Sequence, residues 1–562
     1  MEQGRIIIAI ILSLVVFLAW DFFFSGKKGL KEQEKKAKVV QIEKETQKEE
    51  IQQKPFVKEQ NDEGAKELVE NKIKLLKEEK TTRIITVNTP LYSVKISEKG
   101  AIFKSFVLKN YREAVEKDAP YKEIIVKKNK EGSIILGLKE NSIKGIEKAI
   151  FVSNLNEDTI NIVNEERKVA FSWESPEGII FEKVFLFSPE EYTIGLNVNI
   201  KNGSSQTFND KIKLSLIKYF KQEKAMYGFE GPSALINNKL EQIKTKKLED
   251  KSIFSGDFKW IALQDRYFMS SILPENTADA PEGIMKLLFK DNMLEAQYIL
   301  PNIKVNPGTQ KQIEYKLFLG PKSMKVLKKT GHSLDKAIDF GMFDILAKPC
   351  LWIMNFLHDN VIHNYGIAII ILTMFTKILL WPLGTKSYKS MGEMKKIQPL
   401  MAEIKEKYKN DKKKMNAETM ALYKTYKVNP VGGCLPMVVQ IPVFFALYRM
   451  LYEAIELRHA PFFLWINDLS APDRLFSFDF SIPFMQPPYG IPVLTIIMGA
   501  SMLLQQKMSP PMGDAAQAKM MMFMPIIFTV IFINFSSGLV LYWLVNNVLS
   551  MAQQHYITKK NA

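Results

Sequence analysis

Apolar segments separated by strongly charged sequence constrain this chain more than any other feature. The segments are 6–20, 365–383, 431–448, 489–506 and 520–554. A helix needs about 20 mostly apolar residues to cross a bilayer, and the first four segments approach that length. The last segment is too long for one helix and carries Ser536-Ser537-Gly538 near its middle, so a tight turn there would divide it in two. The sequence therefore predicts six membrane spans.

The first apolar segment has an alternative interpretation as a cleaved signal peptide. No small-x-small cleavage site follows it, and no cysteine near the start would allow lipoprotein processing. We therefore expect residues 1–25 to be an N-terminal transmembrane helix.

Composition indicates an anionic partner and excludes several kinds of site. The 562 residues include 77 Lys and Arg against 61 Asp and Glu, which gives a net charge of +16. Such a basic excess is typical of proteins that meet ribosomal RNA, other nucleic acid or an anionic membrane surface. Two cysteines exclude a disulfide framework, and five histidines are few for a metal centre. The sequence predicts neither a metal site nor a cofactor.

Loop charges predict the orientation in the membrane. Residues 384–430 carry twelve lysines and five acidic residues, whereas residues 452–488 have a net charge of −3. Positive loops stay in the cytoplasm, so we expect both termini to be cytoplasmic and 27–360 to lie outside. The lysines that follow the first span favour the opposite orientation for that span alone. The more strongly charged loop takes precedence, because long domains are translocated largely regardless of charge.

The sequence between the first two spans changes in texture along its length. A tract rich in Lys, Glu and Gln is predicted to be a flexible tether. Runs of Val, Ile and aromatic residues follow, bounded by Gly, Pro and Asn, and predict a β-sandwich-like domain without cysteine. A mixed apolar and charged segment then predicts an interfacial helix interrupted near Pro349. The predicted parts are 1–25 (first span), 26–80 (tether), 81–333 (β-sandwich), 334–360 (interfacial helix), 361–556 (membrane domain) and 557–562 (cytoplasmic tail).

The basic loop 384–430 has a helical pattern of its own. Apolar residues recur at helical spacing from Met391 to Tyr408, and Asn410-Asp411 breaks the run before a second helix. This predicts a helical hairpin with a basic exterior, on which Lys412, Lys413 and Lys414 would dock an anionic partner. The alternative is that the lysines serve only to fix the topology.

One charged residue stands inside a predicted span. Lys377 lies nine residues from Lys386, about 13 Å from the inner end of a straight helix. A lysine at that depth costs about 2.5–3.5 kcal/mol on insertion scales, so it should face water or a partner, unless it snorkels to the inner surface. The same span and other spans carry polar residues that could join it in a polar groove, although each alone is more typical of an interhelical hydrogen bond than of a functional group. These residues are Thr373, Thr376, Gln440, Gln505, Gln506, Asn546 and Asn547.

Several stretches of the chain resemble the YidC/Oxa/Alb membrane-protein insertases. Six spans with a large first outer domain resemble the Gram-negative YidC type of this family, which implies a five-helix insertase core in the bacterial inner membrane. The matching stretches, in order, are 427–436 (Lys-Val-Asn-Pro-Val-Gly-Gly-Cys-Leu-Pro), 440–448 (Gln-Ile-Pro-Val-Phe-Phe-Ala-Leu-Tyr), 456–470, 506–510 (Gln-Lys-Met-Ser-Pro), 523–525 and 537–543 (Ser-Gly-Leu-Val-Leu-Tyr-Trp).

The resemblance implies a hydrophilic groove that is open to the cytoplasm and lipid and closed outside. Lys377 stands where the family usually has an arginine, which keeps the charge but loses the bidentate fork. By position, Thr373, Gln440, Gln506 and Trp543 would line the groove or the adjoining client slide. The implied partners are nascent membrane-protein clients, the Sec translocon, the ribosome with signal-recognition components, and anionic lipids.

The leading hypothesis is therefore a membrane-protein insertase and chaperone that is not an enzyme, built as a polytopic α-helical membrane protein with a β-sandwich-like periplasmic domain. A secondary transporter with a buried cationic site is an alternative, but it predicts inverted repeats and carboxylates inside the spans, and the sequence has neither. An envelope scaffold is a second alternative, in which Lys377 is incidental. Neutralising Lys377 distinguishes the scaffold from the insertase.

Overall fold

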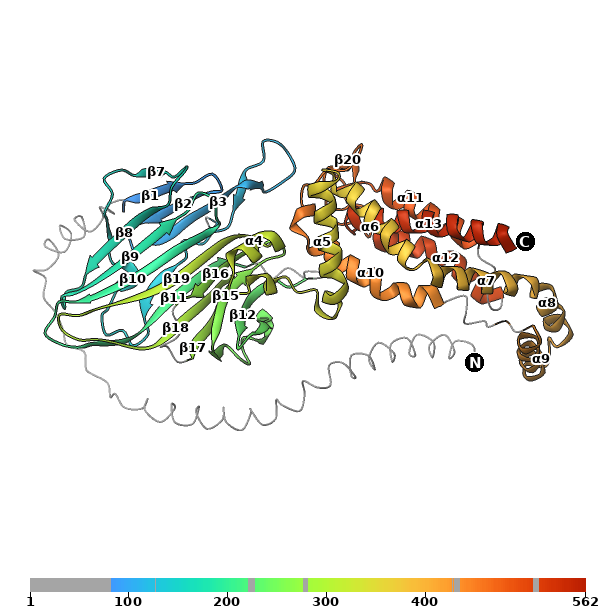
Figure 1. The fold of residues 1–562 in the computed structure, drawn as a ribbon, viewed down its shortest axis with the longest axis horizontal. Helices are drawn as coiled ribbons and strands as arrows, with labels where there is room; N and C mark the ends of the chain where they lie inside the picture. The colour runs from blue at the N-terminus through green and yellow to red at the C-terminus, as the bar shows by residue number, and fades with distance from the viewer. Residues whose placement is uncertain are drawn as a thin grey trace, which may run out of the picture. The chain divides into compact units, whose positions relative to one another are not determined.

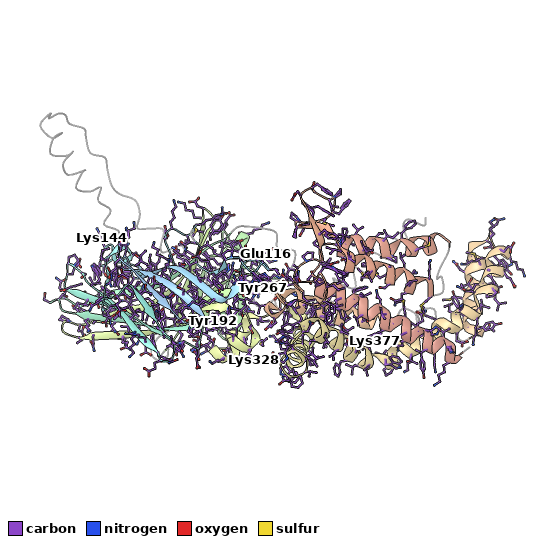
Figure 2. All side chains as sticks on the ribbon, turned by 90° about the horizontal axis from the view of Figure 1, so that it is seen from above. Glu116, Lys144, Tyr192, Tyr267, Lys328 and Lys377 are labelled. Carbon is purple, nitrogen blue, oxygen red and sulfur yellow. The ribbon has the colours of Figure 1, made fainter. Side chains whose placement is uncertain are left out.

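The computed structural model describes residues 82–126, 128–220, 228–275, 282–426, 428, 435–508 and 515–561. The predicted first span (1–25) and tether (26–80) lie outside the described residues. Strands occupy the first part of the described chain and helices the second, so that Tyr192 belongs to the strand-rich part and Lys377 to the helical part (Figure 1, Figure 2).

The largest sheet of the strand-rich part has nine antiparallel strands. Their spatial order is β13-β12-β15-β16-β19-β10-β9-β8-β6. The bounds are β6 (Val152–Ser153), β8 (Arg167–Glu174), β9 (Ile179–Phe187), β10 (Thr193–Asn202), β12 (Gly231–Ile236), β13 (Lys239–Gln242), β15 (Phe258–Gln264), β16 (Phe268–Pro274) and β19 (Gln310–Pro321).

Two sheets of five strands accompany the large one. The first has the order β4-β3-β2-β1-β7 and the second the order β14-β17-β18-β11-β5. The bounds are β1 (Ile84–Asn88), β2 (Tyr92–Ser97), β3 (Ile102–Arg112), β4 (Tyr121–Glu123), β5 (Ile135–Leu138), β7 (Thr159–Asn161), β11 (Phe208–Tyr219), β14 (Ile253–Gly256), β17 (Gly283–Lys290) and β18 (Met293–Val305).

Side chains along the strands alternate between buried and more exposed positions, and the buried side chains of the three sheets form one shared core. Every second residue of β9 is buried, as expected for a strand with one face in a core. From that face, Phe185 contacts Phe103 of the first small sheet with ring centroids 5.1 Å apart, and Phe181 contacts Phe208 of the second at 5.8 Å. Packing of sheet against sheet agrees with the predicted β-sandwich-like fold.

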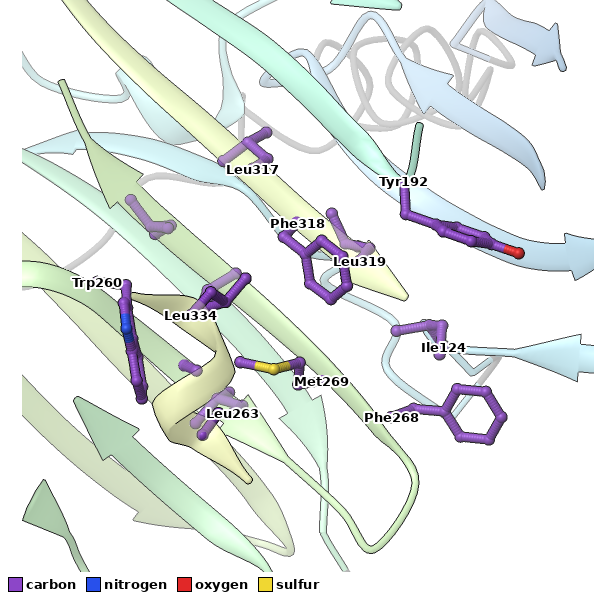
Figure 3. Close-up of a cluster of buried hydrophobic side chains, with 14 of the residues drawn as sticks. Ile124, Tyr192, Trp260, Leu263, Phe268, Met269, Leu317, Phe318, Leu319 and Leu334 are labelled. Carbon is purple, nitrogen blue, oxygen red and sulfur yellow. The ribbon is translucent and has the colours of Figure 1, made fainter. Parts of the chain in front are cut away.

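A short turn of 3₁₀ helix joins the strands to the helices and packs on the sheet. This turn, η4 (Leu334–Ala337), places Leu334 in the core, and the Trp260 indole donates to the Ser333 carbonyl at 3.4 Å (Figure 3). The predicted domain end at residue 333 therefore falls inside a packed region, because residues on both sides of it contact the same sheet.

Helices make up the second part of the chain. Helix α13 packs against α6, α7, α10 and α11. The bounds are α4 (Met324–Thr330), α5 (Asp344–Asn360), α6 (Tyr365–Leu379), α7 (Trp381–Lys396), α8 (Gln398–Lys407), α9 (Lys412–Thr425), α10 (Leu435–Glu453), α11 (Val493–Met508), α12 (Ala515–Phe532) and α13 (Ser537–Asn561).

The helices differ in length from the predicted spans. Among the described residues no single helix is both long and apolar enough to cross a bilayer, although α6 and α7 pass this test as a pair bent by 65°. The fourth predicted span begins four residues late, because Tyr489–Ile491 forms strand β21. The predicted division near Ser536-Ser537-Gly538 is present, but the turn lies slightly earlier, at residues 533–536, because α12 ends at Phe532 and α13 already begins at Ser537.

The bend between α6 and α7 corrects the predicted depth of Lys377. That depth assumed a straight helix from Lys377 to Lys386, whereas α6 ends at Leu379. Pro382 is the second residue of α7. It has no N–H to donate and its ring clashes with the carbonyl four residues earlier, so the helix turns there. Lys377 therefore lies in the last turn of α6.

Prolines also correct two other helix predictions. The interfacial helix is not interrupted at Pro349, because α5 continues from Asp344 to Asn360. The hydrogen bond lost at Pro349 concerns the carbonyl of Ile345, an exposed residue in the first turn. Conversely, the predicted helix from Met391 to Tyr408 breaks at Ile397, where Pro399 opens α8.

The predicted hairpin closes on a small apolar core of its own. Met394, Ile397 and Val428 are buried together, and the Tyr423 hydroxyl contacts the Met401 sulfur at 3.7 Å. Asp411 caps α9, as its carboxylate accepts from the Lys414 backbone N–H at 3.0 Å. The break predicted at Asn410-Asp411 is thus an N-cap.

Candidate functional site

Lys377 points from the last turn of α6 toward α13. Its ammonium donates to the Ser550 hydroxyl at 2.6 Å, and that hydroxyl donates to the Asn546 carbonyl at 2.7 Å. Among the described residues no carboxylate forms an ion pair with Lys377. A lysine held by a neutral hydroxyl keeps its positive charge available to a partner.

Side chains on the rest of α6 show which face of the helix meets the protein. Gly366, Ile369 and Thr373 are buried, whereas Phe375 and Ile378 are exposed. In a membrane, the exposed apolar face would contact lipid, because bilayer and protein interior are similarly apolar. Lys377 lies half-buried at the border between these faces.

Thr373 lies one turn before Lys377 and is only 1% exposed. Its hydroxyl donates to the Ile369 carbonyl of the same helix at 2.6 Å. In this conformation Thr373 is part of the packed face of α6, and its hydroxyl donates within its own helix and not to a neighbouring one.

Gln440 extends the polar contacts from α13 to α10. Its side-chain amide donates to the Asn546 side-chain oxygen at 2.7 Å. Asn546 therefore accepts from Gln440 through its side chain and from Ser550 through its backbone. Together Lys377, Ser550, Asn546 and Gln440 form a polar chain that crosses from α6 through α13 to α10.

The neighbouring Asn547 serves a different contact. Its amide donates to the Ser501 hydroxyl of α11 at 3.0 Å. Gln506, near the end of α11, is half-buried. Among the described residues no hydrogen bond joins Gln506 to the polar chain. The structure thus brings Lys377 and Gln440 together through α13 and leaves Gln506 apart.

Trp543 closes the polar chain at one end with aromatic rings. Its ring centroid lies 4.6 Å from that of Phe444 and 5.2 Å from that of Phe532. The indole N–H is buried and has no hydrogen-bond partner among the described residues. Burying a hydrogen-bond donor without an acceptor costs free energy. An acceptor that approached the Trp543 N–H would remove this cost.

Sequence reasoning missed Ser550 and Gln553. Trp543, Asn546, Ser550 and Gln553 are spaced by three, four and three residues, which places them on one face of α13. The Gln553 amide donates to the carbonyl of Trp381 at the start of α7, at 3.1 Å. This spacing is readable in the sequence and could have identified both residues.

The basic residues proposed for docking lie on a separate element. Lys412 begins α9, Lys413 is exposed, and the Lys414 ammonium lies 5.8 Å from the centre of the Tyr408 ring. Among the described residues, moreover, no group of three His, Cys, Asp or Glu side chains is placed to hold a metal ion.

Two family models together match almost all of the described chain. The YidC periplasmic domain matches residues 84–353, and the 60Kd inner membrane protein matches residues 356–562. Curated relatives described as "Membrane protein insertase YidC" include those of Syntrophus aciditrophicus, 44% identical over 85% of each chain, and of Syntrophobacter fumaroxidans, 40% identical over 84% of this chain and 86% of the relative. The relative from Geotalea uraniireducens is 43% identical over 85% of this chain and 87% of its own. The chain therefore belongs to the YidC family of inner-membrane protein insertases.

Proposed function

We propose that this insertase receives the polar tail of a client along the polar chain formed by Lys377, Ser550, Asn546 and Gln440. The observation that carries this proposal is an ammonium that Ser550 holds among largely apolar helices and that has no carboxylate partner in the described part of the chain. A charge in that setting attracts an acidic group more strongly than it would in water, because the surroundings screen it less.

The apolar part of the client supplies the driving force. Its hydrophobic segment leaves water and enters lipid, while the polar chain offers hydrogen-bonding groups to the tail that must cross. Such a path shortens the distance over which the tail lacks polar partners. No covalent step and no cofactor is required.

We also propose the membrane topology that the loop charges predict. Six spans place both termini and residues 384–430 in the cytoplasm, and residues 27–360 form the periplasmic part. The predicted domain bounds are kept except at residue 333, where the packed region continues into η4. Partners would be the Sec translocon, the ribosome and signal-recognition components, and anionic lipids. The basic α9 residues Lys412, Lys413 and Lys414 supply the docking surface.

The test is insertion into vesicles by purified Lys377 variants, with paired clients that differ only in the charge of the tail. Lys377→Ala should slow a client with an acidic tail about tenfold and leave the neutral-tail client nearly unchanged. Lys377→Glu should be the most damaging, since it repels the acidic tail. Lys377→Arg should preserve insertion of both clients, because the charge is kept.

Lys386→Ala is the matched control, since it removes the same charge from an exposed position on the next helix. It should leave both clients unaffected. Equal slowing of both clients by Lys377→Ala would contradict attraction of acidic tails. Full activity of Lys377→Glu with both clients would contradict any role of this residue in insertion.

A further inference from the structure

The segment between α10 and α11, residues 454–492, exposes an unusual number of large apolar side chains. We call it the aromatic loop. It includes a two-stranded hairpin of β20 (Leu475–Phe478) and β21 (Tyr489–Ile491). Its exposed large apolar side chains are Phe463 (53%), Leu464 (86%), Phe476 (69%), Phe480 (64%), Phe484 (81%) and Ile491 (38%).

Hydrogen bonds hold this loop on the end of the helical bundle. Asn534, in the turn between α12 and α13, donates to the Phe484 carbonyl and accepts from the Gln486 N–H, both at 2.8 Å. Arg474 donates to the Ile533 carbonyl at 2.9 Å and to the Pro488 carbonyl at 2.8 Å. The exposed side chains therefore project from a fixed backbone.

The backbone of the loop directs these side chains outward at a conformational cost. Leu464, Phe476 and Phe484 have positive φ angles of 59°, 56° and 63°. Bulky residues rarely adopt this left-handed conformation, which persists only where the surroundings enforce it. Three large apolar side chains are thus held in strained backbone conformations and are exposed. Exposed apolar patches of this kind mark interaction surfaces, so we expect this one to be covered when the protein functions.

Position and charge indicate what covers it. The loop connects two proposed spans, is tied to the turn between two others and lies at one end of the helical bundle (Figure 1). In the proposed arrangement of the spans, this end meets the membrane surface. It contains no lysine, and its two arginines donate to protein carbonyls. Of its four carboxylates, those of Glu456, Asp468 and Asp473 accept protein hydrogen bonds, and that of Asp479 is exposed. Helix α5, at the same end of the bundle, also exposes Ile345 and Trp352.

We propose that the aromatic loop inserts Phe476, Phe480 and Phe484 into the outer leaflet of the bilayer. It thereby anchors the outer ends of the three helices α10, α11 and α12 at that leaflet. The proposal rests on the proposed arrangement of the spans. Aromatic and aliphatic side chains with few charges are the residues that bury themselves at the boundary between lipid headgroups and acyl chains. The occupant is therefore lipid, not a second protein surface.

The experiment measures the surroundings of each side chain by spin labelling. Single cysteines replace Phe476, Phe480 or Phe484 in the full chain, in a background with Cys350→Ala and Cys434→Ala. The protein is reconstituted in vesicles of phosphatidylethanolamine and phosphatidylglycerol, and collisions of the label with oxygen, which enters lipid, are compared with those of a water-soluble nickel chelate. Ile527→Cys on the exposed face of α12 is the lipid reference, and Val163→Cys in the strand-rich part is the water reference.

Labels at the three loop positions should collide with oxygen several-fold more than with nickel, as the label at Ile527 does. Dominant nickel collisions at all three, with a lipid-like signal at Ile527, would overturn the anchor and leave the insertase proposal intact. A label shielded from both reagents would show that protein covers the loop, which also overturns the proposal. A water-like signal at Ile527 would instead refute the proposed spans. Only labelled variants that still insert the neutral client are measured.

Discussion

Lys183 occupies a core position of β9 and is fully buried. Its ammonium donates to the carbonyls of Ala101 at 2.6 Å, Ile134 at 3.0 Å and Gly100 at 3.3 Å. Ala101 and Ile134 have positive φ angles of 46° and 64°, which are rare outside glycine. Burial lowers the pKa of Lys183 to about 7, yet the three carbonyls match the three N–H donors of the charged form. Lys183 thus holds two strained turns in place.

We expect Lys183→Met to destabilise these turns by roughly 2–4 kcal/mol, because three buried carbonyls lose their donor. Hydrogen exchange of the amides around residues 100–102 and 134 in the full chain should then accelerate by about 30-fold to 900-fold. Lys168→Met, an exposed change on the adjacent strand β8, is the control. Equal protection in both variants would show that Lys183 is dispensable.

Asp210 makes the stability of the strand-rich part depend on pH in the acidic range. Burial alone would raise the pKa of Asp210, but backbone N–H groups of Glu140, Ser142 and Lys211 donate to its carboxylate and lower the pKa below its usual value. The ionised form therefore stabilises the fold. This contribution is complete above the unfolded value of about 3.9 and is lost as pH falls through the lower folded value.

Asp210→Asn should reduce amide protection of residues 140–142 about tenfold at pH 6, after correction for intrinsic exchange rates. The difference from the parent should disappear only once pH falls below the lowered folded pKa of Asp210, where the aspartate is protonated too. Asp250→Asn, at an exposed position, should change nothing. A difference that persists at the lowest pH would mean that the side chain acts by shape and not by charge.

At the scale of elements, the helices α7 to α9 form a basic arm with a core of only a few residues. Replacing Lys412, Lys413 and Lys414 with Glu should weaken binding to ribosomes, and the loss should be greatest at low salt, where charges are least screened. Co-sedimentation at several salt concentrations measures this. The control variant replaces Lys386, Lys389 and Lys395 on α7 with Glu, which changes the charge by the same amount on a different helix. Unchanged co-sedimentation of the α9 variant at low salt would contradict docking.

At the scale of the whole molecule, polar contacts are among those that join the strand-rich part to the helical part. Arg266 donates to the Tyr452 carbonyl at 2.7 Å, and Arg458 donates to the Arg112 carbonyl at 2.6 Å. Ser323 donates to Glu456 at 3.1 Å, and burial raises the pKa of that carboxyl group. None of these residues belongs to the polar chain of Lys377.

Deleting residues 85–320 should therefore leave insertion of a simple single-span client largely intact, because Ser323, α4 and α5 remain. A longer deletion of 85–360 should abolish insertion, since it removes α5, which packs on α6 and α10 through Ala347, Leu351 and Met354. Insertion into vesicles compares the two at equal amounts of membrane-integrated protein. Loss of insertion in the shorter deletion, with the protein present and folded, would refute the prediction.

Runs of Val, Ile and aromatic residues bounded by Gly, Pro and Asn determined, by themselves, that a strand-rich part comes first. The long apolar segments determined that a helical part with a charged residue in an apolar helix follows. The family followed from motifs that keep their order along the chain. These features are local in sequence, since period, composition and spacing act over a few turns or strands.

Only the tertiary structure decided the partners of each polar side chain. Lys377 meets Ser550, 173 residues later, and Gln440 meets Asn546 across a helix pair. Lys183 breaks the apolar pattern of its strand and is satisfied by carbonyls from two distant turns. Such contacts depend on how elements pack, and hydrogen bonds between residues far apart in sequence leave no periodic trace in the chain itself.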